Sequence, residues 1–271
     1  MKCRLAVSTG CCVNRPFAGI LDELHAAGVS AVEVGTPPRH FDPWRTDEVT
    51  ALGARLKRLD IQPIAIHAPF GGLLDLTDPN PQHRHAAIGA VLSAASALRD
   101  VGGSRVVVHV SDVPRAGQNL SERIGHAVDS FRVLARACRY MNVTVVIETP
   151  LPHLIGGHPE DFAAILESLD QSRTPVAVCL DTSHTTLGGH WDRFVRVAGP
   201  RIIHVHANDH RGHRDDHLRP GDGTIDWTHV RESLEALGFE GWIVLELACP
   251  DGAVTSYVET AMRQARTLLA C

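Results

Sequence analysis

Arg-Val-Val-Val-His-Val at 105–110 and Thr-Val-Val-Ile-Glu at 144–148 are the stretches that decide the fold, and a segment with apolar residues at three- and four-residue spacing separates them at 120–140. The two short runs are nearly all apolar and β-branched, which is typical of strands buried on both faces of a parallel sheet. The spacing at 120–140 predicts an amphipathic helix. Residues 105–148 therefore predict one strand–helix–strand unit.

The same unit recurs along the whole chain. The strands are expected at 4–8, 31–35, 62–67, 105–110, 144–148, 177–181, 201–206 and 242–247. The helices are expected at 17–27, 47–59, 82–101, 120–140, 159–169, 191–197, 227–237 and 254–269. This alternation favours an α/β fold in which residues 1–271 form a single domain, a closed (β/α)8 TIM barrel. An open doubly wound sheet is the alternative, but Ser8-Thr9-Gly10-Cys11-Cys12 lacks the glycine-rich turn of a nucleotide-binding fold.

Composition excludes several classes of function. The 271 residues include 26 Lys plus Arg and 31 Asp plus Glu, a net charge of −5 with no basic run, which argues against nucleic acid as a partner while leaving a local patch open. The only lysines, Lys2 and Lys57, lie neither in a glycine-rich turn nor in the setting of a Schiff-base lysine.

The same composition indicates a compartment and a redox state. No signal sequence and no membrane-spanning apolar run is recognisable, so we expect a cytoplasmic protein without a membrane partner. The seven cysteines form no C-x-x-C pair and are expected to be buried, reduced thiols without a disulfide framework. The sequence leaves a homo-oligomer open.

Six consecutive predicted strands end in a potential metal ligand or acid–base group. Residues at the carboxyl ends of barrel strands face the active-site mouth, so these side chains should converge. They are His67, His109, Glu148, Asp181, His206 and Glu246. His184 follows Asp181 by three residues, and five of the 17 histidines fall between 204 and 217, where Asp215 and His217 precede a Pro-Gly-Asp-Gly turn. Imidazole and carboxylate donors without a thiolate predict a catalytic Zn, Mn, Co, Fe(II) or Mg site.

This series of motifs resembles the xylose isomerase-like TIM-barrel superfamily, which contains sugar phosphate isomerases and epimerases and the endonuclease IV type of apurinic/apyrimidinic (AP) endonuclease, AP endonuclease family 2. The resemblance rests on His67-Ala-Pro, Glu148-Thr, Asp181-Thr-Ser-His184, His206-Ala-Asn-Asp209 and Asp215-Asp-His217 followed by Pro220-Gly-Asp-Gly-Thr-Ile-Asp-Trp227. It runs from about residue 4 to residue 260 and implies an enzyme of the isomerase or epimerase class acting on a sugar, a sugar phosphate or a related polyhydroxy-carbonyl compound.

The resemblance further implies residue roles. Glu148, Asp181, His206 and Glu246 would hold one divalent ion, and Glu148 and Glu246 would transfer a proton through a metal-stabilised enediolate. Apart from the resemblance, we expect His67, His109, His184, His217 and Arg219 to bind the substrate, and Asn208 and Asp209 to orient His206. Arg211 and Arg214 are further candidates for a substrate anion, and Phe41 and Trp44 for an apolar wall or lid.

Two alternatives remain open at this level. The endonuclease IV-like members hold a trinuclear zinc cluster, and the additional ligand types they require are present as His67, His109, His184, Asp215 and His217. A multinuclear zinc phosphodiesterase is therefore one alternative, although Pro69-Phe70 stands where the repair enzymes usually have a Tyr, and the mouth loops lack a basic run with aromatic wedges. A lyase or dehydratase using the same enolate chemistry is the other.

Overall fold

The chain folds as a closed parallel barrel with helices around it, in a computed structural model that describes residues 3–12, 15–37, 39–250 and 252–271. Lys2 and position 38 of the expected lid loop lie outside this range. The strands are β1 (Arg4–Ser8), β2 (Ala31–Val34), β3 (Gln62–His67), β4 (Arg105–His109), β5 (Thr144–Glu148), β6 (Ala177–Asp181), β7 (Ile202–Ala207) and β8 (Trp242–Leu245). Each pairs in parallel with the next, and β1 pairs with β8 to close the ring. The predicted (β/α)8 TIM barrel is confirmed.

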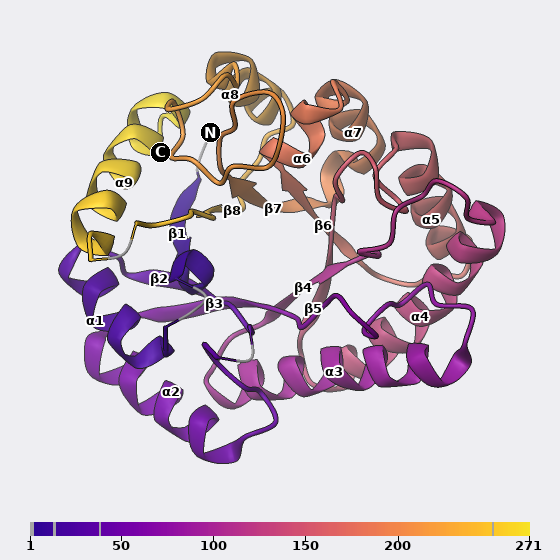
Figure 1. Ribbon diagram of the computed structural model, residues 1–271, viewed down its shortest axis with the longest axis horizontal. Coiled ribbons are helices and arrows are strands. Elements are labelled where there is room, and N and C mark those ends of the chain that lie inside the picture. The colour runs from indigo at the N-terminus through magenta and orange to yellow at the C-terminus, as the bar shows by residue number, and fades with distance from the viewer. Residues whose placement is uncertain (1–2, 13–14, 38, 251) are drawn as a thin grey trace.

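Helices form the outer layer, as Figure 1 shows in projection. They are α1 (Phe17–Ala26), α2 (Thr46–Leu59), α3 (Pro81–Asp100), α4 (Leu120–Tyr140), α5 (Pro159–Gln171), α6 (Thr182–Leu187), α7 (Trp191–Ala198), α8 (Trp227–Ala236) and α9 (Val254–Leu269), with the short 3-10 helices η1 (Thr9–Cys12) and η2 (Gly199–Arg201). The short helices α6, η1 and η2 were not predicted. Within the described residues no helix is long and apolar enough to cross a membrane.

Alternate residues of each strand pack in two separate cores. Val107 of β4 and Val146 of β5 point into the barrel, where small side chains such as Ala6 and Ala65 share the space. Val106 and Ile147 point outward and pack in the larger core between strands and helices. Because both faces are buried, most of the strands are nearly uninterrupted apolar runs, and this made the fold predictable.

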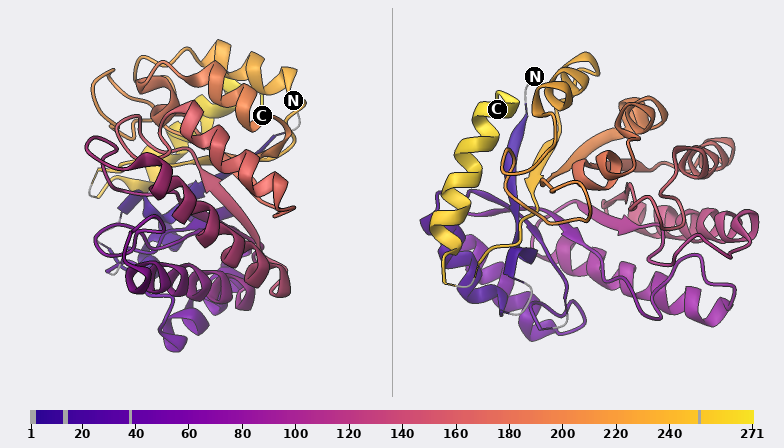
Figure 2. Two further views of the ribbon diagram at one scale, coloured as in Figure 1. Left: turned by 90° about the vertical axis from the view of Figure 1, so that its right-hand side faces the viewer. Right: turned by 45° about the horizontal axis from the view of Figure 1, so that its top comes forward.

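One prediction about the cysteines is wrong. Cys3 and Cys271 form a disulfide, with their Cα atoms 5.4 Å apart although 268 residues separate them in sequence. The closure of the barrel brings the two ends together: β1 lies beside β8, and α9 runs back along β1 to its beginning, so that the chain ends are neighbours in both views of Figure 2. Cys11, Cys12, Cys138 and Cys179 are buried thiols outside any disulfide, and Cys249 is a half-buried one.

Candidate functional site

The predicted strand-end residues lie together at the carboxyl end of the barrel. His67, His109, Glu148 and Asp181 are the last residues of β3, β4, β5 and β6, respectively. His206 is the last residue but one of β7, and Glu246 follows β8 directly. The common direction of the parallel strands delivers all six side chains to one region.

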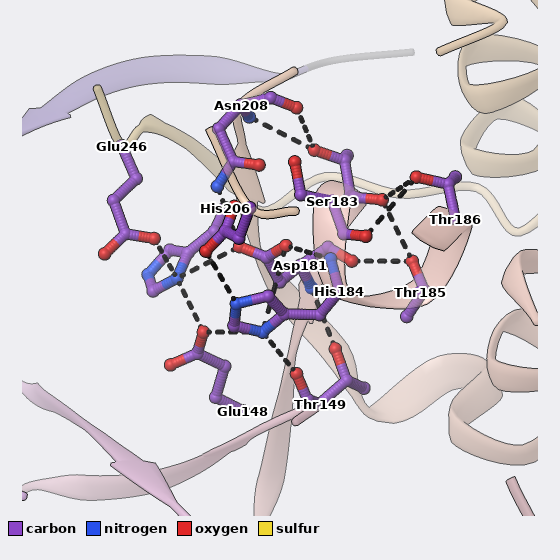
Figure 3. Close-up of polar contacts among 12 residues, drawn as sticks. Glu148, Thr149, Asp181, Ser183, His184, Thr185, Thr186, His206, Asn208 and Glu246 are labelled. Carbon is purple, nitrogen blue, oxygen red and sulfur yellow. Dashed lines mark hydrogen bonds and ion pairs between the residues drawn. The ribbon is translucent and has the colours of Figure 1, made fainter. Parts of the chain in front are cut away.

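Four of these residues form a compact group of donors. One ligand atom from each of Glu148, Asp181, His206 and Glu246 lies within 4.8 Å of the ligand atoms of the other three. His206 Nδ1 lies 3.3 Å from Glu148 Oε1, 3.2 Å from Glu246 Oε2 and 3.9 Å from Asp181 Oδ2. Figure 3 shows Glu148 and Glu246 extending toward the His206 ring. These are the four residues for which the sequence predicted a metal.

The charge of this group suits a divalent cation. Three buried or half-buried carboxylates surround a single imidazole. Burial lowers the pKa of His206, but the acidic groups around it, Glu246 and Glu33 among them, raise it well above its ordinary value. Burial raises the pKa of Asp181 to about 6, with His184 opposing this effect and Asp215 adding to it. A positive charge between these carboxylates would therefore be stabilised. Oxygen donors with one imidazole are a ligand set that suits Mn, Zn, Co or Mg. The residues present therefore fit a metal ion.

Glu33 fixes the orientation of His206 and is not among the residues predicted from the sequence. This residue lies in β2 with its side chain completely buried. His206 Nε2 donates a hydrogen bond of 3.1 Å to Glu33 Oε1, so that Nδ1 is the nitrogen that faces the three carboxylates. His204 Nε2 lies 2.9 Å from the other oxygen of Glu33. Burial raises the pKa of Glu33, but the nearby imidazoles of His206 and His204 lower it far below its ordinary value. Glu33 therefore remains an anion.

A second group of donors shares Glu148 with the first. His67 Nε2 and His109 Nε2 each lie 3.0 Å from Glu148 Oε2, and the ligand atoms of these three residues lie within 4.8 Å of one another. Burial raises the pKa of Glu148, but His109 and His206 lower it well below its ordinary value. Glu148 thus has one oxygen facing each group.

Asp215 joins the remaining two predicted histidines. Its Oδ2 lies 3.3 Å from His184 Nε2 and 2.8 Å from His217 Nε2. His184 Nδ1 donates to the carbonyl of Thr149 at 2.8 Å, and His217 Nδ1 donates to the carbonyl of Glu246 at 3.1 Å. Both Nε2 atoms are thereby turned toward the same carboxylate. The structure thus brings together all nine residues proposed as metal ligands.

Other predicted residues lie elsewhere or act differently. The guanidinium of Arg219 lies 2.6 Å from Asp222 and covers the ring of Tyr257 at 4.6 Å, so it does not point into the donor groups. Neither Asn208 nor Asp209 is among the hydrogen-bond or ion-pair partners of His206. Asn208 Nδ2 instead donates to Asp181 Oδ2 at 3.0 Å, so the residue it orients is Asp181.

Asp209 organises the loop after β7. Its carboxylate accepts hydrogen bonds from the backbone N–H groups of His210, Gly221 and Ile225 at 2.9, 2.9 and 3.1 Å, and from the indole N–H of Trp227 at 2.8 Å. The Pro-Gly-Asp-Gly turn is therefore fastened to the end of β7. Arg211 and Arg214 pair with Asp216 on the exposed side of this loop.

A cavity of about 710 Å³ opens beside the donor groups. Its inner end is lined by His67, His217 and Glu246, and its outer part by residues after β1, β2, β3 and β8. Phe41 and Trp44, predicted as an apolar wall or lid, both line it, with Phe41 completely buried and Trp44 56% exposed.

Comparison with known protein families gives one match that covers most of the chain. Residues 21–269 match the family model described as xylose isomerase-like TIM barrel. Among curated proteins, "Uncharacterized protein MJ1311" of Methanocaldococcus jannaschii is 27% identical over 190 residues, which cover 68% of this chain and 64% of that protein. Inosose dehydratase of Geobacillus thermodenitrificans is 31% identical over 124 residues, 38% of this chain and 40% of that protein. The matched region thus spans less than two thirds of either relative.

Solved structures share the fold over the whole chain. A D-tagatose 3-epimerase-like protein superimposes with a TM-score of 0.84 at 21% sequence identity, covering 100% of this chain and 98% of that one. The IOLI protein with a binding zinc atom gives a TM-score of 0.83 at 18% identity, with the same coverage of both chains. At these identities the likeness establishes the architecture.

Proposed function

Because the chain belongs to the xylose isomerase-like TIM-barrel family, we propose that it is a divalent-metal-dependent isomerase or epimerase of a sugar or a related polyhydroxy-carbonyl compound. The observation that carries this proposal is the pair of carboxylates, Glu148 and Glu246, placed on either side of His206 Nδ1 at 3.3 and 3.2 Å. The neighbouring structures named for 3-epimerases support the class of reaction.

Glu148, Asp181, His206 and Glu246 would hold the ion. When bound, it supplies a Lewis acid that stabilises negative charge on the oxygens of a substrate carbonyl and its neighbouring hydroxyl. Nε2 of His206 is occupied by Glu33, so Nδ1 is the nitrogen available to the ion. This arrangement resembles the carboxylate–histidine pairs that hold ligands of catalytic metals.

The surroundings of the two carboxylates assign them different roles. Glu246 lines the cavity and retains about a fifth of its side-chain exposure, so its carboxylate reaches a substrate carbon and removes the proton. Glu148 is buried as a carboxylate with both oxygens facing imidazoles, so it would first take a proton from His67, whose Nε2 lies 3.0 Å from its Oε2, and then return that proton to the substrate. Two carboxylates in different environments are the usual means of dividing base and acid roles.

The test is isotope exchange from solvent. The protein loaded with Mn, Zn, Co or Mg is incubated in heavy water with ketoses, aldoses and inososes, and exchange next to the carbonyl is followed by NMR. Glu246→Gln is expected to lower the exchange rate by about 10²- to 10⁴-fold. Glu240→Gln, which changes an exposed carboxylate before β8, is the matched control. If Glu246→Gln exchanges at the wild-type rate, or no metal-loaded sample exchanges any of these sugars, the proposal fails.

A second candidate is a multinuclear metal phosphodiesterase of the AP endonuclease type. The observation that favours it is the group of His67, His109 and Glu148 beside the first group, with Asp215 between two further histidines. Two or three ions in such groups can activate water and stabilise a leaving oxygen. Elemental analysis separates the candidates. More than one ion per chain, with part of the metal lost in His109→Ala, would favour the hydrolase if the protein also nicks abasic duplex DNA. One ion per chain would exclude it.

A lyase or dehydratase reaction on the same scaffold is distinguished by its product. The partial match to an inosose dehydratase motivates this comparison. Elimination changes the mass of the product by one water, whereas isomerisation and epimerisation leave it unchanged, so mass spectrometry of the reaction mixture decides between them.

A further inference from the structure

The cavity beside the donor groups is larger than a single sugar requires. At about 30 Å³ per water molecule, its 710 Å³ corresponds to roughly 24 water molecules, whereas a hexose has about 12 non-hydrogen atoms, half of that number. A volume of this size falls among pockets that enclose drug-sized ligands. Since the inner end is lined by Glu246, His67 and His217, a sugar held there would leave the outer part of the cavity unfilled.

The outer part is lined mainly by apolar groups, and its few polar side chains already bind other parts of the protein. Thr36 Oγ1 already donates to the carbonyl of His67 at 2.7 Å, and Asp42 Oδ1 accepts the backbone N–H of Trp44 at 2.9 Å. The guanidinium of Arg15 pairs with Glu23. A hydroxyl buried without a partner costs roughly 1–3 kcal/mol, so a second polyhydroxylated ring would be poorly held here.

The remaining wall is apolar and partly aromatic. Phe41, Pro43, Trp44, Phe70, Leu74 and Leu247 line it. Trp44 and Phe70 are 56% and 49% exposed, which places them among the few large apolar side chains on the described surface of the molecule. Exposed apolar groups gathered at one concave place are typical of a ligand-binding surface.

We propose that the substrate is a polyhydroxy-carbonyl unit that carries an apolar substituent about the size of an aromatic ring. The hydroxylated unit lies at Glu246, His67 and His217, and the substituent lies against Trp44, Phe70 and Leu74. This inference rests on the proposed function for the identity of the inner unit, but the preference for the substituent follows from the outer wall alone.

The test measures binding to the metal-loaded protein by calorimetry, with matched pairs of 6-O-phenyl and 6-O-methyl ethers of fructose, tagatose, glucose and galactose, which leave the carbonyl carbon unsubstituted. The phenyl member is expected to bind about tenfold more tightly or better than its methyl partner. Intrinsic fluorescence gives a second readout, because Trp191, Trp227 and Trp242 are at most 5% exposed and Trp44 is the exposed tryptophan. The emission of Trp44 should shift to shorter wavelength when a phenyl group covers its ring.

The control variants separate the wall from the rest of the surface. Trp44→Ala should remove most of the phenyl preference, whereas Leu73→Ala, at a 68% exposed residue that does not line the cavity, should retain it. Equal binding within each pair, no binding of any phenyl ether up to about 10 mM, or an unchanged preference in Trp44→Ala would overturn the proposal. A phenyl preference without isotope exchange in any sugar would contradict the proposed function alone, and exchange in free ketoses with no phenyl preference would contradict this inference alone.

Discussion

Glu33→Gln is expected to weaken divalent-metal binding while leaving the barrel folded. Glutamine has the same length and can still accept the His206 Nε2 hydrogen bond, which is 3.1 Å long in the structure. It loses the negative charge, however, and its amide group must face His204 Nε2, which lies 2.9 Å from Glu33 Oε2. The ring of His206 is then held less firmly with Nδ1 toward Glu148 and Glu246.

The size of the effect follows from the bond that changes. A hydrogen bond to a charged group contributes about 1.5–3 kcal/mol and one between neutral groups about 0.5–1.5 kcal/mol, so the exchange costs about 1–1.5 kcal/mol, or roughly tenfold in affinity. Residues that support metal ligands typically change metal affinity by about 10- to 100-fold when replaced. We therefore expect a loss of at least about tenfold in Glu33→Gln.

Calorimetric titration of the metal-free protein with Zn²⁺ and Mn²⁺ measures this loss directly. Thermal unfolding of the metal-free protein checks that the variant is folded, and the nitrogen chemical shifts of His206 report which ring nitrogen carries the proton. Glu160→Gln, an exposed carboxylate at the beginning of α5 that pairs with Arg193, is the control and should bind as the wild type does. A folded Glu33→Gln protein with wild-type metal affinity would refute the argument that Glu33 orients His206.

Three further predictions concern the stability of the fold. Asp209→Ala should lower the free energy of unfolding by about 3 kcal/mol or more, because one buried carboxylate accepts four hydrogen bonds, while Asp209→Asn should lose less; chemical denaturation measures both. Reduction of the Cys3–Cys271 disulfide should destabilise the protein by about 2–4 kcal/mol, so that reductant lowers the unfolding temperature of the wild type. Reductant should not change the unfolding temperature of a Cys3→Ser variant. His40 has ring nitrogens that contact the Arg15 carbonyl and Thr9 Oγ1, and burial lowers its pKa, so the folded protein favours the neutral imidazole. Stability from this residue is present above the unfolded pKa of about 6.5 and falls as the pH drops toward the folded pKa, by at most about 1.4 kcal/mol per pH unit, and His40→Gln should flatten that slope between about pH 7.5 and 5.5.

The regular elements were predictable because their signals are local. The strands at β1, β3, β5 and β6 and the helices α4 and α9 have the predicted bounds. In each of them the apolar pattern of residues close in sequence shows which positions are buried, on both faces of a strand or on one face of a helix. Helix α6 was not predicted because its six residues are too few for a periodic pattern, and it begins instead through the side chain of Asp181, which accepts the N–H of His184.

The parts that could not be predicted depend on long-range contacts. Glu33 sits in the middle of the short strand Ala-Val-Glu-Val, not at its end, and nothing near it in sequence indicates a partner. Its partners, His204 and His206, lie about 170 residues later and meet it only across the barrel interior. The disulfide escaped prediction for the same reason, since neighbouring chain ends are a consequence of barrel closure.

Glu148 links the number of bound ions to the proposed proton transfer. Its Oε1 faces His206 in the first donor group, and its Oε2 faces His67 and His109 in the second. A carboxylate whose two oxygens bind two ions has no oxygen left to return a proton to a substrate, whereas a carboxylate bound to one ion retains the second oxygen for that role. Isomerase chemistry therefore requires His67 and His109 to contact Glu148 or the substrate directly, and hydrolase chemistry requires them to hold an ion. The occupant of the space between His67, His109 and Glu148 would therefore decide between the two proposed reactions.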